Sequence, residues 1–107
     1  MGYTLTGKGL QRTQRVEVKV GQSVYFGASG SPDLVEVVSV DAQWITVDRR
    51  GAQVREQRWI AEDLIARGMS TMRRRAHDML DWAQDAGSVM APLYRQQAQA
   101  ILEIVRA

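Results

Sequence analysis

The sequence predicts an α+β protein in which an antiparallel meander of five strands precedes two or three helices. Two observations predict this class. Before Trp59, apolar residues alternate with polar ones in short runs such as 16–20 and 45–47, which is the two-residue period of strands with one buried face. After Trp59, apolar residues recur three and four positions apart, as in Ile60, Leu64 and Ile65, which is the period of amphipathic helices.

The first half of the chain divides into short strands separated by turn residues. Gly21, the 27–33 loop rich in glycine and serine, the 41–43 turn and Gly51 break the alternating pattern. Because curling removes exposed strand edges, an SH3-like barrel is the simplest arrangement for such a meander. The five predicted strands are residues 15–20, Ser23–Gly27, Leu34–Val40, Trp44–Asp48 and Gln53–Gln57.

The second half is predicted to contain a short helix, a longer helix and a last helix. The first spans Trp59–Arg67 and ends at Gly68, since glycine is the usual residue just past a helix. Ser70 or Thr71 can cap the next helix, which runs to about Ala86. The last begins around Pro92 and is apolar over more than half its circumference. So wide a face should contact both the preceding helix and the sheet, or else another chain.

Length and composition indicate a single domain over residues 1–107, with a flexible arm (1–14), a β-meander (15–58) and a helical part packed on it (59–107). The absence of cysteine excludes disulfides and thiolate chemistry. No apolar stretch approaches the ~20 residues of a membrane span, and the start of the chain does not resemble a signal peptide. We therefore expect a cytoplasmic protein without membrane attachment.

The sequence nominates no catalytic or metal-binding set. His77 is the only histidine, and no nucleophile or second acid accompanies it in a recognisable pattern. Asp78, Asp81 and Asp85 could face a cation, but they lack the glycine-turned loop and carbonyl donors of a calcium site. We expect no enzyme activity, no metal and no cofactor.

Arginine accounts for twelve of the fourteen basic residues, and its planar fork suits phosphate and carboxylate groups. One group lies in or beside the 49–51 turn, and another opens a predicted helix, where the macrodipole prefers acids. Such placement favours a role in binding a partner. The alternative is that these arginines lie on an ordinary solvent-exposed surface, where nearby acidic side chains neutralise their charge. The arginines concerned are Arg49, Arg50, Arg55, Arg58, Arg73, Arg74 and Arg75.

Tyr25 and Trp44 are the candidate stacking residues, because exposed aromatic rings on strands can stack on bases or on a partner's side chains. The alternative is that both rings belong to the core, as most large aromatic residues in small domains do.

These observations favour a non-enzymatic binding protein, an adaptor or modulator that docks on a larger host protein and forms a homodimer. The composition suits a small bacterial chain of phage or plasmid origin. The alternative is a DNA- or RNA-binding accessory protein that uses the arginine-rich hairpin and Arg73–Arg75. Besides the arginines, the predicted docking residues lie on the last helix: Tyr94, Ile101, Leu102 and Val105.

Overall fold

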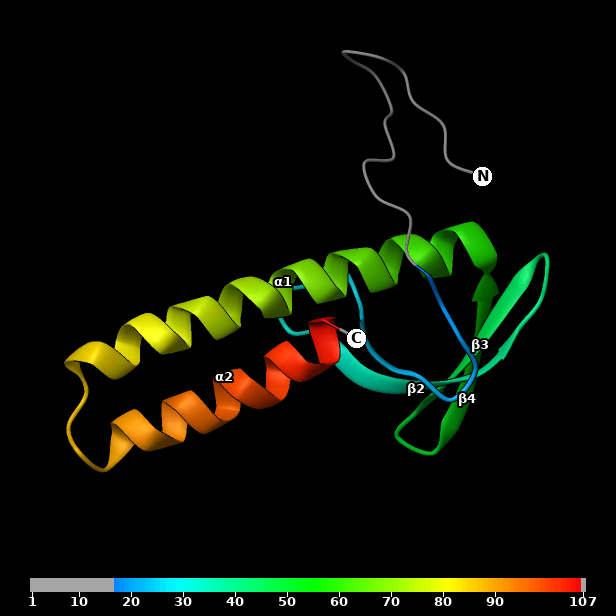
Figure 1. Ribbon diagram of the computed structural model, residues 1–107. Helices are drawn as coiled ribbons and strands as arrows, with labels where there is room; N and C mark the ends of the chain where they lie inside the picture. The colour runs from blue at the N-terminus through cyan, green and yellow to red at the C-terminus, as the bar shows by residue number, and fades with distance from the viewer. Residues whose placement is uncertain (1–16, 107) are drawn as a thin grey trace, which may run out of the picture.

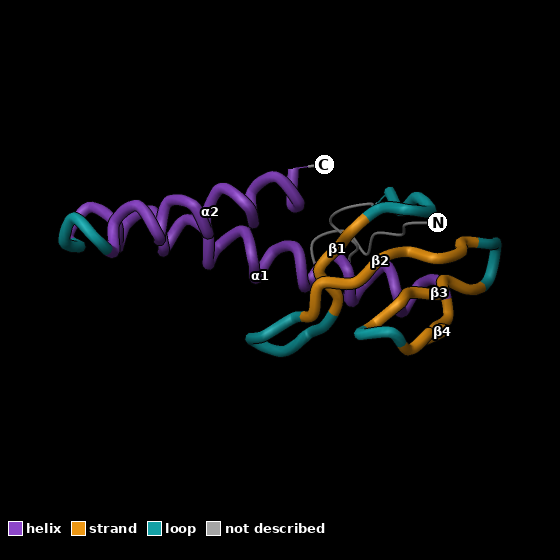
Figure 2. Tube along the Cα trace, turned by 90° about the horizontal axis from the view of Figure 1, so that it is seen from below, coloured by secondary structure: helices purple, strands orange, loops and turns teal. Residues whose placement is uncertain are grey.

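The protein is α+β in the computed structural model, which describes residues 17–106 (Figure 1). A four-stranded antiparallel sheet in the order β1-β2-β3-β4 precedes two helices. Each strand pairs with its neighbour in sequence, so the sheet is the predicted meander (Figure 2). The elements are β1 (Ser23–Phe26), β2 (Asp33–Val40), β3 (Trp44–Arg49), β4 (Ala52–Gln57), α1 (Arg58–Asp85) and α2 (Met90–Arg106).

The four strands agree with the alternating pattern to within a residue or two, and the turns explain where they end. Arg50 and Gly51 both adopt positive φ, at 57° and 85°, which is the backbone of a two-residue type I′ hairpin. In the preceding turn, the Asp41 carboxylate accepts hydrogen bonds from the backbone N–H groups of Gln43 (2.9 Å) and Trp44 (2.8 Å). This turn aligns β2 with β3.

The predicted first strand, residues 15–20, is wrong over its described part. Residues 17–20 form no strand, and Val20 is 63% exposed. The chain reverses here because Gly21 has φ +87° and the Gln22 side-chain oxygen accepts a hydrogen bond from the Lys19 N–H (3.0 Å). Residues 15 and 16, like the predicted arm 1–14, lie outside the described residues.

The predicted SH3-like barrel is also wrong, because the described sheet stays open. Its apolar face is covered by the first half of α1, so closure is not needed to bury it. Ala61 and Ile65 of α1 are fully buried against this face. The strands contribute Val24, Phe26, Val35, Val37, Ile45 and Val47 to the same core.

The predicted helix end at Gly68 is wrong, since Gly68 lies inside α1, which is 28 residues long and ends at Asp85. Gly68 is buried where α1 crosses β1, and a Cβ atom there would lie 2.5 Å from the Tyr25 carbonyl oxygen. Beside this contact, the Gly27 N–H donates to the Leu64 carbonyl oxygen (3.1 Å). Glycine therefore permits close helix–strand packing here. Ser70 and Thr71 lie within the helix and do not cap it.

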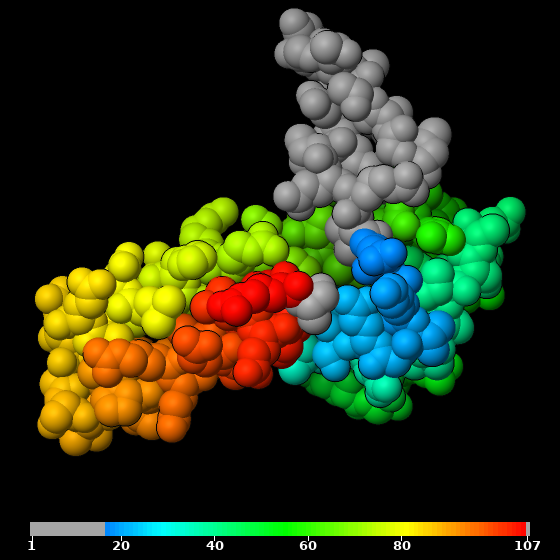
Figure 3. All heavy atoms as spheres, in the orientation of Figure 1, coloured from blue at the N-terminus to red at the C-terminus, as the bar shows by residue number. Residues whose placement is uncertain are grey.

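A second core joins α1 and α2 to the edge of the sheet. Tyr25 points away from the first core and packs in the second, and α2 runs antiparallel to α1 (Figure 1). The far half of this helical hairpin extends beyond the sheet as an arm (Figures 2 and 3). The buried residues of this core are Tyr25, Met72, Ala76, Ala98, Ile101, Leu102 and Val105.

Candidate functional site

The arginines of the β3–β4 turn are held by a single carboxylate. Arg49 and Arg50 form ion pairs with Asp33 at the start of β2, at 2.6 and 3.0 Å. Both guanidinium groups stay largely exposed while the Asp33 carboxylate is mostly covered. The pairing ties the turn to β2 and offsets part of its positive charge.

The two predicted stacking residues do not form one platform. Tyr25 is 7% exposed and belongs to the second core, where burial raises the pKa of its phenol above the ordinary 10.0. Trp44 is half-buried on β3, and the Arg55 guanidinium lies 4.1 Å from its ring centroid. One face of the Trp44 ring is therefore already occupied by a cation–π contact within the chain.

Arg58 connects the sheet to the start of α1. Its guanidinium donates to the Glu62 carboxylate (3.1 Å) and to the backbone carbonyl of Asp41 (3.0 Å). The same Asp41 carboxylate has a pKa below its ordinary 3.8, because the backbone N–H groups of Gln43 and Trp44 donate to its charged form. Arg58 thus holds the β2–β3 turn against α1.

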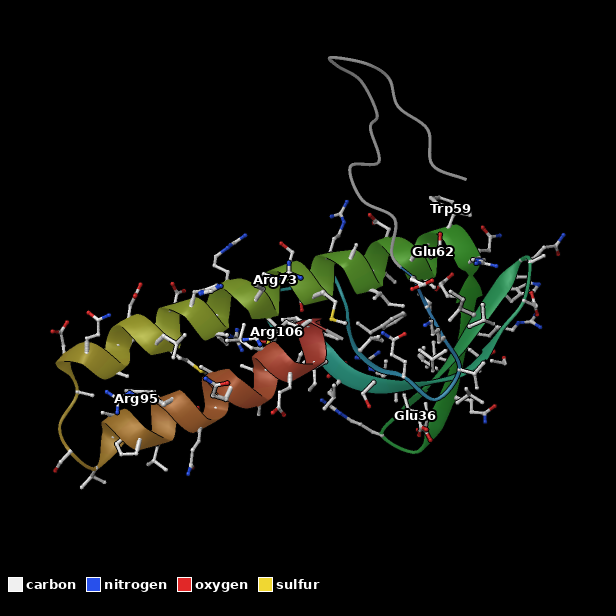
Figure 4. The ribbon with its side chains drawn as sticks, viewed as in Figure 1. Glu36, Trp59, Glu62, Arg73, Arg95 and Arg106 are labelled. Carbon is white, nitrogen blue, oxygen red and sulfur yellow. The ribbon has the colours of Figure 1, made fainter. Side chains whose placement is uncertain are left out.

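Arg73, Arg74 and Arg75 lie near the middle of α1 and not in a first turn, so the argument from the macrodipole does not apply to them. Arg73 donates to the Val105 carbonyl near the end of α2 (3.3 Å), in the region labelled in Figure 4. Arg75 donates to the Gly30 carbonyl in the β1–β2 loop (2.6 Å). Among the described residues, only Arg74 of the three has no partner.

The predicted docking face of α2 is largely internal. Ile101, Leu102 and Val105 are each less than 9% exposed, in contact with α1 and with β1 through Tyr25. Their burial explains why the apolar face is so wide: it packs against two elements of the same chain. Tyr94 is half-buried, and its ring meets that of Trp82 edge to face with centroids 5.8 Å apart.

Sequence reasoning identified only Tyr94 of the apolar surface at the tip of the hairpin. Met90 and Leu93, three residues apart on α2, are each 44% exposed, and Tyr94 lies one turn beyond Met90, against Trp82. Trp82 is 51% exposed and Val89, in the connecting turn, 74%. Exposed apolar side chains grouped in this way, unlike ones scattered singly, are typical of interaction sites. We call Trp82, Val89, Met90, Leu93 and Tyr94 the tip patch.

The positions buried between the helices near this tip hold alanines. Ala83 and Ala91 are buried at the outer end of the hairpin, and Ala76 and Ala98 are fully buried further in. Small side chains let the two helices approach closely. Met79 and Leu80 are partly buried against the same core, whereas the large apolar side chains of the tip patch lie mostly outside it.

Carboxylates border the tip patch on α1. Asp78 and Asp85 lie four residues before and three after Trp82, so they share its side of the helix. Both are exposed, and neither forms an ion pair or side-chain hydrogen bond with a described residue. Residues 76–94 contain three aspartates and no lysine or arginine. The tip segment therefore carries −3 in a chain of net charge +2.

Comparison with protein-family models, curated proteins and solved structures finds no match to this chain. Within residues 17–106, neither helix is apolar enough over a sufficient length to cross a bilayer. In the same part of the chain, no three histidine, cysteine or acidic side chains converge as metal ligands would. Of the seven large apolar side chains that are exposed among the described residues, four belong to the tip patch.

Proposed function

We propose that this chain is a protein-binding module that docks through the tip patch. One observation carries the proposal: large apolar side chains lie outside a hairpin whose buried positions at the same level are alanines. Trp82 and Tyr94 supply the rigid aromatic area from which binding hot spots are commonly built. The half-exposed Met90 adds a side chain that adapts to its contacts.

The arm shape favours the same function. The sheet core anchors the first half of α1, and the far half of the hairpin holds the tip away from it (Figure 1). The mixed charges around the sheet make no comparable surface, because Arg49, Arg50 and Arg58 are engaged by Asp33, Glu62 and backbone oxygen. We propose that the partner of the tip patch is a larger protein of the host cell and not a nucleic acid.

The test is capture from the source cells with purified wild type and matched variants, carried out with and without nuclease treatment. The Val89→Ser/Leu93→Ser double variant removes apolar area and leaves the Trp82–Tyr94 contact in place. Trp59→Ser is the control, because Trp59 is 63% exposed at the opposite end of α1 and points away from the sheet (Figure 4). We expect the double variant to lose a protein that wild type and control both retain.

The expected loss is at least about tenfold in retained partner, since burying a valine or leucine side chain contributes about 1.5–3 kcal/mol and 1.4 kcal/mol is tenfold in affinity. Thermal unfolding of the double variant should change little, because both residues are already substantially exposed. Equal retention of every protein by the double variant and wild type would count against the tip patch. Nuclease-sensitive nucleic acid as the retained species would favour the alternative function.

A further inference from the structure

We infer that the occupant of the tip patch is a basic amphipathic helix of another protein, with positive side chains spaced seven residues apart. The inference rests on the proposed function and names the chemistry of the partner. It combines three features of the described residues: the apolar tip patch, the unpaired carboxylates of Asp78 and Asp85 beside it, and the spacing of these two carboxylates along α1.

The charge distribution selects a basic partner. The tip segment, residues 76–94, carries −3 while the whole chain carries +2, so the rest of the chain carries +5 (2 + 3). Arginines border this segment on both sides: Arg75 donates to the Gly30 carbonyl, Arg74 lies one turn before Asp78, and Arg95 follows Tyr94. The dipole ends of α1 and α2 meet at the tip with opposite signs and offset each other. Asp78 and Asp85 lie one turn on either side of Trp82 and pair with no described residue, so beside the Trp82 ring they favour cationic side chains of a partner.

The geometry selects a helix with a defined spacing. Asp78 and Asp85 are seven residues apart on α1, which is two turns or about 10.5 Å along the axis. A helix lying beside α1 brings residues i and i+7 to the same separation. Its apolar side chains between these positions would face Trp82, Met90 and Leu93, as a third helix packs on a hairpin. Lysine or arginine at i and i+7 would then reach the two carboxylates.

The same charges disfavour a second copy docked tip to tip. A twofold contact places each surface against itself, so it would bring two segments of −3 together. Like charges opposed across an interface weaken association. The homodimer expected from sequence therefore becomes an outcome to be tested and is not the occupant that we propose.

The test uses two synthetic 21-residue amphipathic peptides with the same leucine stripe. One carries lysine at positions i and i+7 beside the stripe, and the other carries glutamate there. Fluorescence anisotropy of labelled peptide gives the Kd for the purified full-length chain at low and high salt. We expect the lysine peptide to bind at least about tenfold more tightly, with a preference that shrinks as salt screens exposed charges.

Two double variants test the carboxylates. Asp78→Asn/Asp85→Asn should weaken lysine-peptide binding about tenfold and leave glutamate-peptide binding no weaker. Glu36→Gln/Glu103→Gln is the matched control, since it removes two exposed charges away from the tip patch and should change Kd less than twofold. The aspartate variant should unfold at the same or a higher temperature, because it removes negative charge near the C-terminal end of α1. Weaker binding with unchanged stability would reflect the charges and not misfolding.

Equal binding of both peptides, or wild-type binding by Asp78→Asn/Asp85→Asn, would overturn this inference. Such a result leaves the proposed function standing if Val89→Ser/Leu93→Ser still abolishes partner capture. If that double variant captures its partner normally, the proposed function itself is wrong. Analytical ultracentrifugation of wild type at the assay concentration measures its oligomeric state. If wild type is a dimer and Val89→Ser/Leu93→Ser is a monomer, the occupant of the tip patch is a second copy of this chain and the inference is wrong.

Discussion

Gly68 offers the sharpest test of how α1 is seated on the sheet. A Cβ atom at this position would lie 2.5 Å from the Tyr25 carbonyl oxygen and 2.7 Å from its carbon. The obstacle is backbone, so no side chain can rotate away to make room. Alanine would require the Cβ and the oxygen to separate by at least 0.5 Å (3.0 − 2.5), which moves α1 away from β1.

The cost of Gly68→Ala follows from what that movement disturbs. Inserting a carbon into a packed site typically costs about 1–3 kcal/mol. Weakening the adjacent hydrogen bond from the Gly27 N–H to the Leu64 carbonyl (3.1 Å) adds about 1 kcal/mol. Replacing a glycine within a helix by alanine returns about 1 kcal/mol. We expect a net loss of about 2 kcal/mol in the free energy of unfolding.

Urea denaturation followed by circular dichroism measures this loss. The midpoint should fall by roughly 1 M with little change in slope. Gly87→Ala is the control, because a Cβ there would meet nothing within 4 Å, and its midpoint should stay near wild type. Gly68→Asn distinguishes a helix end from a close packing contact. Asparagine is tolerated at a helix end with positive φ, whereas in a close contact we expect it to lower the stability more than alanine does. A variant Gly68→Ala as stable as wild type would refute the close approach of α1 and β1.

Two further predictions concern pH. Burial raises the pKa of Tyr25 above 10.0, so the phenol ionises at lower pH in the unfolded chain than in the folded one. The stability that this burial contributes is present below pH 10 and is lost as pH rises through the folded pKa. In thermal unfolding above pH 10, we expect Tyr25→Phe to lose less stability than either wild type or Tyr94→Phe. Backbone hydrogen bonds lower the pKa of Asp41 below 3.8, so its contribution is present above that value and lost as pH falls through the folded pKa. Asp41→Ala should therefore lose less stability on acidification than wild type does, and an identical acid dependence would contradict the turn geometry.

The strands were predictable because alternation reports one buried face directly. Val35 and Val37, like Ile45 and Val47, are buried in the structure as the two-residue period requires. The open sheet was not predictable, since alternation does not say whether another strand or a helix covers the apolar face. Here the covering element is α1, which lies after the last strand and packs back over the sheet (Figure 1).

The helices illustrate a different ambiguity. A glycine after an amphipathic run can mark a helix end or a close packing contact within a helix, and the sequence pattern does not distinguish the two. Reading Gly68 as an end placed Arg73–Arg75 in a first turn and created a dipole penalty that the continuous helix does not have. One local misinterpretation thus produced a second, at residues five to seven positions further along.

Apart from Tyr94, the tip patch escaped prediction because hydrophobic periodicity does not distinguish alanine from leucine. Ala83 and Ala91 fall on the apolar stripes and are buried, whereas Trp82 and Leu93 lie at their margins and are exposed. A hairpin selected only for its own stability would place the larger side chains inside, where each buries more apolar area. The arrangement here is reversed at the end of the arm farthest from the sheet, and unpaired carboxylates accompany it. The exposed side chains contribute less to the stability of the chain than they would if buried. Their apolar area and the carboxylate charges remain available to another protein, and this is the physical reason for the proposed docking at the tip.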